Sequence, residues 1–146
     1  MRTRKILWPT DFSDTASHAL SYAVEMANLY NVGLRILNVV DQLSGDENFQ
    51  VLVLTPEELT KGLETAAAEK MKQLLSKLDI DLEVETVVRR CEQNNVAEQI
   101  LKESEQGDIG MIVMASHGRV GLSHFFHNNV ANKVTNKAEC PVLIVK

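Results

Sequence analysis

The chain lacks the features that mark several large classes of protein. Its 146 residues include only two cysteines, Cys91 and Cys140, which lie far apart and form no Cys-x-x-Cys pair. No pattern therefore supports a disulfide, a zinc site or a redox role. Acidic residues outnumber basic ones by 20 to 15, the net charge is −5, and the basic residues are dispersed. Without a basic face or stripe, nucleic acid is not an expected partner.

Long apolar runs and linker segments are also missing. The first apolar run, Ile6–Trp8, is far too short for a signal-peptide core or a membrane span, so we expect a cytoplasmic protein with no membrane partner. No Pro/Gly/Ser-rich or low-complexity stretch divides the chain. With 45% hydrophobic residues, the chain can fill one core, and we expect a single domain over residues 1–146.

What the chain does contain is an alternation of strand-like and helix-like apolar patterns. Apolar runs predict strands at 6–8, 34–40, 109–114 and 142–145, and residues 82–88 suit a strand near a sheet edge because charged and apolar residues alternate at its start. Helical spacing links Ala16 to Ala27, Leu59 to Leu78, Val96 to Leu101 and Phe126 to Val134. Residues 42–54 show no strong periodicity and are expected to form a loop.

Capping residues mark where two of the helices begin. Thr55-Pro56-Glu57-Glu58 combines an N-cap, a proline at the first helical position and a glutamate three residues after the cap. This is the clearest helix start in the chain. Either Asp11 or Ser13 can cap the first helix.

The order of elements predicts an α/β fold with a doubly wound parallel sheet and helices on both faces. Right-handed crossovers convert a β-α-β-α-β-α-β-α-β chain into such a sheet. Its ligand is expected outside the carboxyl ends of the strands, where the winding reverses. Three segments follow strand ends and are the places to seek a site: Pro9–Asp11, Val39–Asp41 and Met114–Gly121.

Three longer segments of the chain together resemble the universal stress protein family, and the resemblance spans the whole chain. They are Ile6-Leu7-Trp8-Pro9-Thr10-Asp11-Phe12-Ser13, Met114-Ala115-Ser116-His117-Gly118-Arg119-Val120-Gly121-Leu122 and Cys140-Pro141-Val142-Leu143-Ile144-Val145. The resemblance implies a five-stranded sheet in the order 3-2-1-4-5. It also implies, in many members, a homodimer, which here would pair through residues 142–146.

One branch of this family binds ATP through the motif Gly-x2-Gly-x9-Gly-Ser/Thr, which falls here on Ala115, Gly118, Asn128 and Asn129. Only Gly118 matches strictly. Ala115 still offers its backbone N–H, Asn128 tolerates positive φ, and Asn129 keeps an amide donor in place of a hydroxyl. Two lost hydrogen bonds of about 1 kcal/mol each would weaken binding roughly 30-fold without abolishing it. The motif alone leaves two alternatives open. The protein either binds ATP or AMP weakly, with Mg²⁺ present only together with the nucleotide, or it is a family member that has lost ATP binding.

The resemblance implies roles for further residues, each with an ordinary structural alternative. Asp11 would contact the ribose or simply cap a helix, Val39 would lie beside adenine or in the core, and Arg119 would pair with phosphate or be solvated. His117 belongs to the Ser-His-Gly signature, in a turn or beside phosphate, and has no supported catalytic role. His124 and His127 lack a third ligand and predict no metal site. The remaining candidate nucleotide contacts are Pro9, Thr10, Met114, Gly121 and Val130.

The last strand supports a dimer independently of the resemblance. Residues 142–145 contain no charge or proline, yet this strand would lie at a sheet edge, where unpaired backbone groups invite another strand. A two-fold contact with a second subunit would cover it.

Three functions remain open on the sequence. The first is a stress-associated regulatory protein in which ATP orders residues 115–129 and alters the surface seen by an unidentified protein partner. The second is a dimeric interaction protein of the same fold that binds no ATP, which Asn128 and Asn129 favour. The third is a hydrolase, but the sequence contains no paired carboxylates near the loop, no Gly-x-Ser-x-Gly elbow and no P-loop lysine, so at most slow nucleotide hydrolysis is expected.

Overall fold

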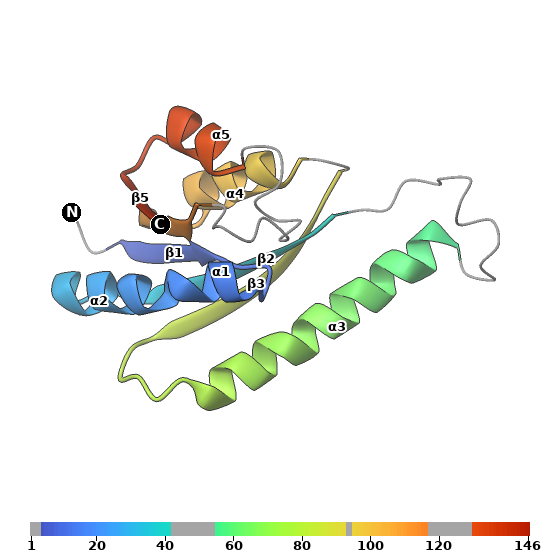
Figure 1. Cartoon of the computed structure of the whole chain (residues 1–146), viewed down its shortest axis with the longest axis horizontal. Helices are drawn as coiled ribbons and strands as arrows, with labels where there is room; N and C mark the ends of the chain where they lie inside the picture. Colours follow the sequence, from blue (N-terminus) through green and yellow to red (C-terminus); the bar gives the residue numbers. More distant parts are fainter. Residues whose placement is uncertain (1–3, 42–54, 93–94, 117–129) are drawn as a thin grey trace.

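The computed structural model describes residues 4–41, 55–92, 95–116 and 130–146 and contains a five-stranded parallel sheet in the order β3-β2-β1-β4-β5 (Figure 1). This confirms the predicted fold class and strand order. The strands are β1 Lys5–Pro9, β2 Leu34–Asp41, β3 Val84–Cys91, β4 Ile109–Ala115 and β5 Val142–Val145. The helices are α1 Asp14–His18, α2 Leu20–Tyr30, α3 Pro56–Lys77, α4 Val96–Gln106 and α5 Val130–Lys137.

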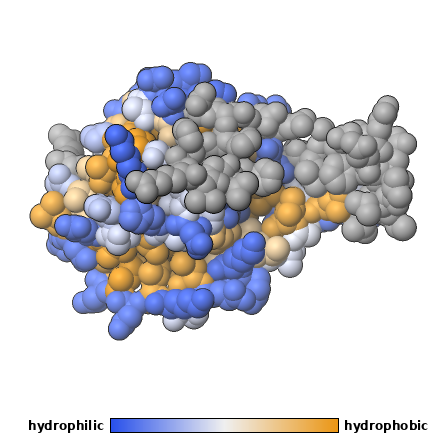
Figure 2. Space-filling view, in the orientation of Figure 1, coloured by the Kyte–Doolittle hydropathy of each residue, from blue (hydrophilic) through white to orange (hydrophobic). Residues whose placement is uncertain are grey.

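Helices cover both faces of the sheet, with α1, α2 and α3 on one side and α4 and α5 on the other (Figure 1). The central strand β1 carries Ile6, Leu7 and Trp8, all completely buried, because both of its faces are covered. The Trp8 indole N–H donates to the carbonyl of Ala16 at 3.1 Å, which attaches α1 directly to β1. Apolar side chains also gather on the surface between α2 and α3 (Figure 2).

The capping predictions are resolved in favour of serine at the first helix. The Ser13 hydroxyl accepts from the Ala16 N–H at 3.1 Å and caps α1, whereas Asp11 accepts from the Ser13 N–H at 2.9 Å and lies outside the helix. At α3 the full capping box is present, with Thr55 and Glu58 each accepting from the other's backbone N–H at 3.2 Å.

Two elements differ from the sequence pattern. The first helix is divided at Ala19, whose N–H bonds the carbonyl three residues earlier, that of Ala16, at 3.1 Å. Strand β3 begins at Val84, two residues later than the predicted strand 82–88, and continues three residues beyond it to Cys91, because each of its residues pairs with one on β2. Its place at the end of the strand order confirms the prediction of an edge position. Phe126 and the predicted loop 42–54 lie outside the described residues.

A network of buried and half-buried charges ties α4 to the sheet. Arg35 on β2 donates to Glu85 on β3 at 2.8 and 3.0 Å and to Glu103 on α4 at 3.1 Å. Glu103, whose side chain is only 6% exposed, also accepts from Arg89 at 3.0 Å, and Lys5 on β1 bonds Glu85. Because an unpaired charge in this position is costly, the network specifies one placement of α4 on β2 and β3.

The network also explains why residue 107, directly after α4, is glycine. A Cβ at this position would lie 1.9 Å from the Arg35 guanidinium and 2.7 Å from the Glu103 carbonyl. Arg35 cannot move aside freely, since two carboxylates hold it. Gly62 in α3 is a natural comparison, because a Cβ there would meet nothing within 4 Å.

We therefore predict opposite effects for the same substitution at the two glycines. Gly107→Ala should destabilise the protein by about 1–3 kcal/mol through overpacking against Arg35. Gly62→Ala should stabilise it by up to about 1 kcal/mol, because alanine is the better helix former. Urea unfolding of both variants measures the difference, and equal changes at the two positions would contradict the steric role of Gly107.

A second prediction concerns pH. Hydrogen bonds from Lys5 and Arg35 hold the pKa of the Glu85 carboxyl below its ordinary value. Since the folded pKa is the lower one, this carboxylate stabilises the fold above the unfolded pKa, and that stability is lost as pH falls through the folded pKa. Glu85→Gln should lower the unfolding free energy at about pH 7, and its deficit should shrink toward about pH 3. Glu69→Gln, at an exposed position on α3, is the control, and a pH-independent deficit for Glu85→Gln would refute the assignment.

Candidate functional site

The turn after β1 is held to β2 by a set of hydrogen bonds. The Thr10 N–H donates to the Leu37 carbonyl at 2.8 Å, and the Asn38 side-chain amide donates to the Thr10 carbonyl at 2.9 Å. The Thr10 hydroxyl, which is completely buried, accepts from the Phe12 N–H at 2.9 Å. These bonds use the polar groups of Thr10 to shape the turn.

Phe12 follows in a conformation that is unusual for a bulky residue. Its φ is 66°, in the left-handed region that costs an ordinary side chain about 1 kcal/mol or more. Hydrogen bonds on both sides maintain it: Thr10 accepts from the Phe12 N–H, and the Asp11 carboxylate accepts from the Ser13 N–H. The turn therefore places both Asp11 and Phe12 just beyond the carboxyl end of β1.

A cavity of about 500 Å³ opens beside this turn, a volume within the usual range for small-molecule sites. Its walls come from the β1–α1 turn, the carboxyl end of β2, helix α3 and the first residue of α4. The lining residues are Asp11, Phe12, Asn38, Val39, Val40, Asp41, Leu63, Ala66, Ala67, Lys70 and Val96. Most of this surface is apolar, with a few charged groups that could orient a ligand.

The charged groups of the cavity have identified neighbours. The Lys70 ammonium lies 5.7 Å from the centre of the Phe12 ring, within the range of a cation–π contact. The Asp41 carboxylate accepts from the Cys91 thiol at 3.7 Å. Two carboxylates, one ammonium and Asn38 are thus the polar groups of a mostly apolar lining.

Of the candidate nucleotide contacts, the structure brings Asp11 and Val39 together as lining residues of this cavity. Five others, Pro9, Thr10, Met114, Ala115 and Val130, are buried and do not line it. Strand β4 pairs with β1, so its carboxyl end, which leads to Ser116, lies at the same edge of the sheet. The candidates His117, Gly118, Arg119, Gly121, Asn128 and Asn129 lie outside the described residues.

The sequence reasoning missed the wall that α3 contributes. Leu63, Ala66 and Lys70 line the cavity. In the sequence, Leu63 and Ala66 belong to the apolar stripe of the predicted helix, and nothing set them apart from its other residues. Leu63 is in fact 44% exposed. The spacing of 63, 66, 67 and 70 marks one helical face, which was the available signal, but it could not tell which loop that face would meet.

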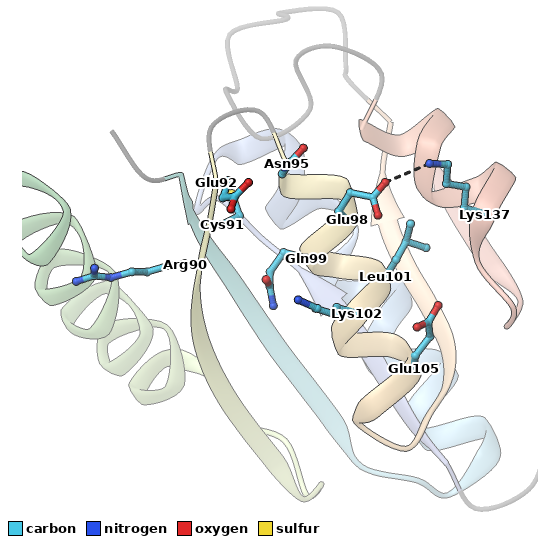
Figure 3. A pocket seen from close by; sticks show the side chains of 10 residues that line it. All are labelled: Arg90, Cys91, Glu92, Asn95, Glu98, Gln99, Leu101, Lys102, Glu105 and Lys137. Carbon is cyan, nitrogen blue, oxygen red and sulfur yellow. Dashed lines mark hydrogen bonds and ion pairs between the residues drawn. The ribbon is translucent and has the colours of Figure 1, made fainter. Parts of the chain in front are cut away.

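A second cavity, about 680 Å³ in volume, lies on the other face of the sheet and contains none of the candidate residues (Figure 3). Arg90 points away from it toward α3, where it bonds Glu57 at 3.0 Å and Glu64 at 2.7 Å. Glu98 and Lys137 form an ion pair of 3.1 Å across it. Its charged lining residues are balanced in sign, with Arg90, Lys102 and Lys137 beside Glu92, Glu98 and Glu105, so they do not favour a ligand of either charge.

Two other kinds of site are absent from the described part of the chain. Residues 4–41, 55–92, 95–116 and 130–146 contain no group of three or more His, Cys, Asp or Glu residues able to hold a metal ion. None of the helices described there has the length and hydropathy needed to cross a membrane. Cys91 and Cys140, both within the described residues, are not joined in a disulfide, and burial raises the pKa of Cys140.

Comparisons with known proteins match this architecture. The model of the universal stress protein family matches residues 2–146. Universal stress protein MJ0577 of Methanocaldococcus jannaschii is 30% identical, over 98% of this chain and 94% of its own length. Its solved structure superposes with a TM-score of 0.77 and 29% identity, covering 100% of this chain and 97% of that one. UspA of Lactobacillus plantarum superposes with a TM-score of 0.76 at 22% identity, covering 100% and 99% of the two chains.

Two more distant solved structures contain nucleotides. One is a universal stress protein in complex with cAMP, with a TM-score of 0.58, 19% identity and coverage of 98% and 97% of the two chains. The other is the universal stress protein of Archaeoglobus fulgidus in complex with dAMP, with a TM-score of 0.60, 20% identity and full coverage of both chains. At these identities the likeness to this chain concerns the fold.

Proposed function

Because the chain belongs to the universal stress protein family, we propose that it is a small regulatory protein of the stress response that binds an adenine nucleotide and acts as a cytoplasmic homodimer. One observation carries the nucleotide part of the proposal: the Asp11 carboxylate and Val39 line a single cavity at the carboxyl ends of β1 and β2. Parallel α/β sheets bind their ligands at this edge.

The order of the strands suggests how a nucleotide would lie. The cavity lies beside β2, Asp11 comes two residues after the end of β1, and β4 on the far side of β1 leads into residues 116–130. A base in the cavity would put the ribose at Asp11 and direct the phosphates toward the carboxyl end of β4, after which Gly118 and Arg119 follow in the sequence. The Asp11 carboxylate accepts one hydrogen bond from Ser13 and retains acceptor capacity for a ribose hydroxyl. The relatives that bind cAMP and dAMP support a ligand of this class.

The second candidate function is a dimeric interaction protein that binds no nucleotide. It is favoured by Asn128 and Asn129, which stand where the ATP-binding branch has glycine and a hydroxyl residue. In either case the protein would act by binding, with nucleotide hydrolysis at most slow. Incubation with ATP, with and without Mg²⁺, measures that turnover.

The nucleotide proposal is tested by titrating ATP into the purified protein and its Asp11→Asn variant. Asparagine can still accept from the Ser13 N–H and preserve the turn, but it removes the charge that the ribose hydroxyls would meet. We expect binding in the micromolar range for the unchanged protein and a loss of roughly 10-fold in the variant, because a charge-assisted hydrogen bond contributes about 1–1.5 kcal/mol more than a neutral one.

Asp14→Asn is the matched control, since Asp14 is exposed on α1 and does not line the cavity. Mass spectrometry of small molecules released from the denatured protein gives an independent measurement, and copurified adenine nucleotide is the expected result. Absence of copurified nucleotide together with absence of binding at millimolar ATP would reject the proposal and leave the interaction protein.

The dimer proposal rests on the geometry of β5. Within the described residues, β5 lies at the end of the strand order. The Pro141 carbonyl accepts from the N–H of Ile112 on β4, and the Val145 carbonyl accepts from the N–H of Ser116 just after β4, at 2.9 Å each. Because backbone polar groups alternate in direction along a strand, the N–H groups of Val142 and Ile144 face the open edge. Antiparallel pairing with β5 of a second copy would use these groups, and a two-fold axis would relate the copies.

Ile144→Pro tests this pairing with little disturbance of β4, because it removes an outward-facing N–H. We expect this variant to be monomeric, while Ile144→Ala, which loses more of the side chain than Ile144→Pro but keeps the N–H, remains dimeric. Size-exclusion chromatography with light scattering measures the mass of each. A dimeric, folded Ile144→Pro protein would show that the subunits associate through another surface.

A further inference from the structure

The α3 side of the cavity contains features that binding a ribose at Asp11 does not explain. Phe12 keeps a bulky side chain at φ 66°, a conformation that glycine adopts without cost. Strain of this kind persists where the surrounding structure enforces it, and it clusters at ligand-binding sites. Here the consequence of the strained backbone is that the Phe12 ring lines the cavity next to Asp11.

The wall around the ring suits a flat, largely apolar group. Leu63 is 44% exposed, Ala66 and Ala67 are small, and Val40 completes the apolar lining. Lys70, four residues after Ala66 on α3, reaches over the ring with its ammonium 5.7 Å from the ring centre. Lys70 is exposed and its four-carbon side chain is flexible, so it can move outward to admit a ligand while remaining above it.

We propose that Phe12 and Lys70 form a clamp for a planar aromatic ring, with the ring stacked on Phe12 and the Lys70 ammonium above its other face. The clamp rests on the proposed function, since the ring would be the base of the bound nucleotide. The clamp would recognise the π-face of the ring, which every base possesses, and would therefore tolerate different bases. Adenine and guanine nucleotides should therefore differ in affinity by less than about 10-fold, unlike at a site that reads base edges by hydrogen bonds.

The clamp is tested with adenosine, which carries a base and ribose but no phosphate. In methyl-labelled protein, millimolar adenosine should shift the NMR resonances of Leu63 and Val40. Phe12→Gly, in which glycine relieves the φ strain but removes the ring, should weaken adenosine binding by roughly 5- to 100-fold. Phe12→Tyr should restore it. Thermal unfolding of each variant distinguishes lost stacking from lost folding, because a purely structural role would give a Phe12→Gly protein with a reduced melting temperature and unchanged adenosine affinity.

Lysine substitutions test the second half of the clamp. Lys70→Met keeps the aliphatic side chain and removes the charge, and it should weaken adenosine binding roughly 2- to 5-fold. Lys72→Met, two residues further along α3 and outside the cavity lining, should leave it unchanged. Equal effects of the two substitutions would overturn the role of Lys70.

An ATP titration run in parallel separates the clamp from the proposed function. ATP binding that depends on Asp11, with no adenosine shifts at Leu63 or Val40, would overturn the clamp and leave the proposed function standing. Adenosine shifts that require Phe12, with no affinity for ATP, would support the clamp and reject the nucleotide proposal. Absence of both signals would reject both, and adenosine shifts that persist in Phe12→Gly would overturn the clamp alone.

Discussion

The placement of α4 on the sheet is constrained by the Arg35 guanidinium, which bonds Glu85 on β3 and Glu103 on α4 and whose side chain is 15% exposed. Lys5 extends the same network to β1, so three strands and a helix share it. A network of this kind adds little net free energy, because desolvation offsets much of the attraction, but it penalises every arrangement that leaves one charge unpaired. It thereby selects one position for α4, whose first residue, Val96, lines the candidate site.

A second set of contacts fixes the position of the candidate site relative to the sheet. The backbone and side chain of Thr10 bond Leu37, Asn38 and Phe12, so the turn after β1 cannot shift independently of β2. Helix α3 closes the cavity from the same face of the sheet as α1, and Arg90 anchors it to β3 through Glu57 and Glu64. The site is therefore formed by rigid elements on two sides and by a strained turn between them, which suits a small ligand that must be held in one orientation.

Much of the fold was predictable because the signals are local. The continuous apolar run at Ile6–Trp8 predicted a central strand, and Thr55 with Glu58 predicted the start of α3, since a capping box involves only neighbouring residues. The choice between Ser13 and Asp11 as the cap of α1 was not predictable. Both residues have suitable oxygens, and the turn imposed by Thr10 and β2 determines which of them reaches the free N–H groups.

The candidate site was likewise predictable from the sequence only in part. Its position at the carboxyl ends of the strands, and the presence there of Asp11 and Val39, follow from strand order and from the motif after β1. The burial of Thr10 and Met114, the strained Phe12 and the contact between Lys70 and Phe12 do not. The sequence by itself determined which segments are strands and helices and in what order they wind, because periodicity and capping act over a few residues. Only the tertiary structure decided which face of α3 meets the β1 turn and which charges Arg35 joins, because those contacts link residues 50 or more positions apart, at distances that no local pattern encodes.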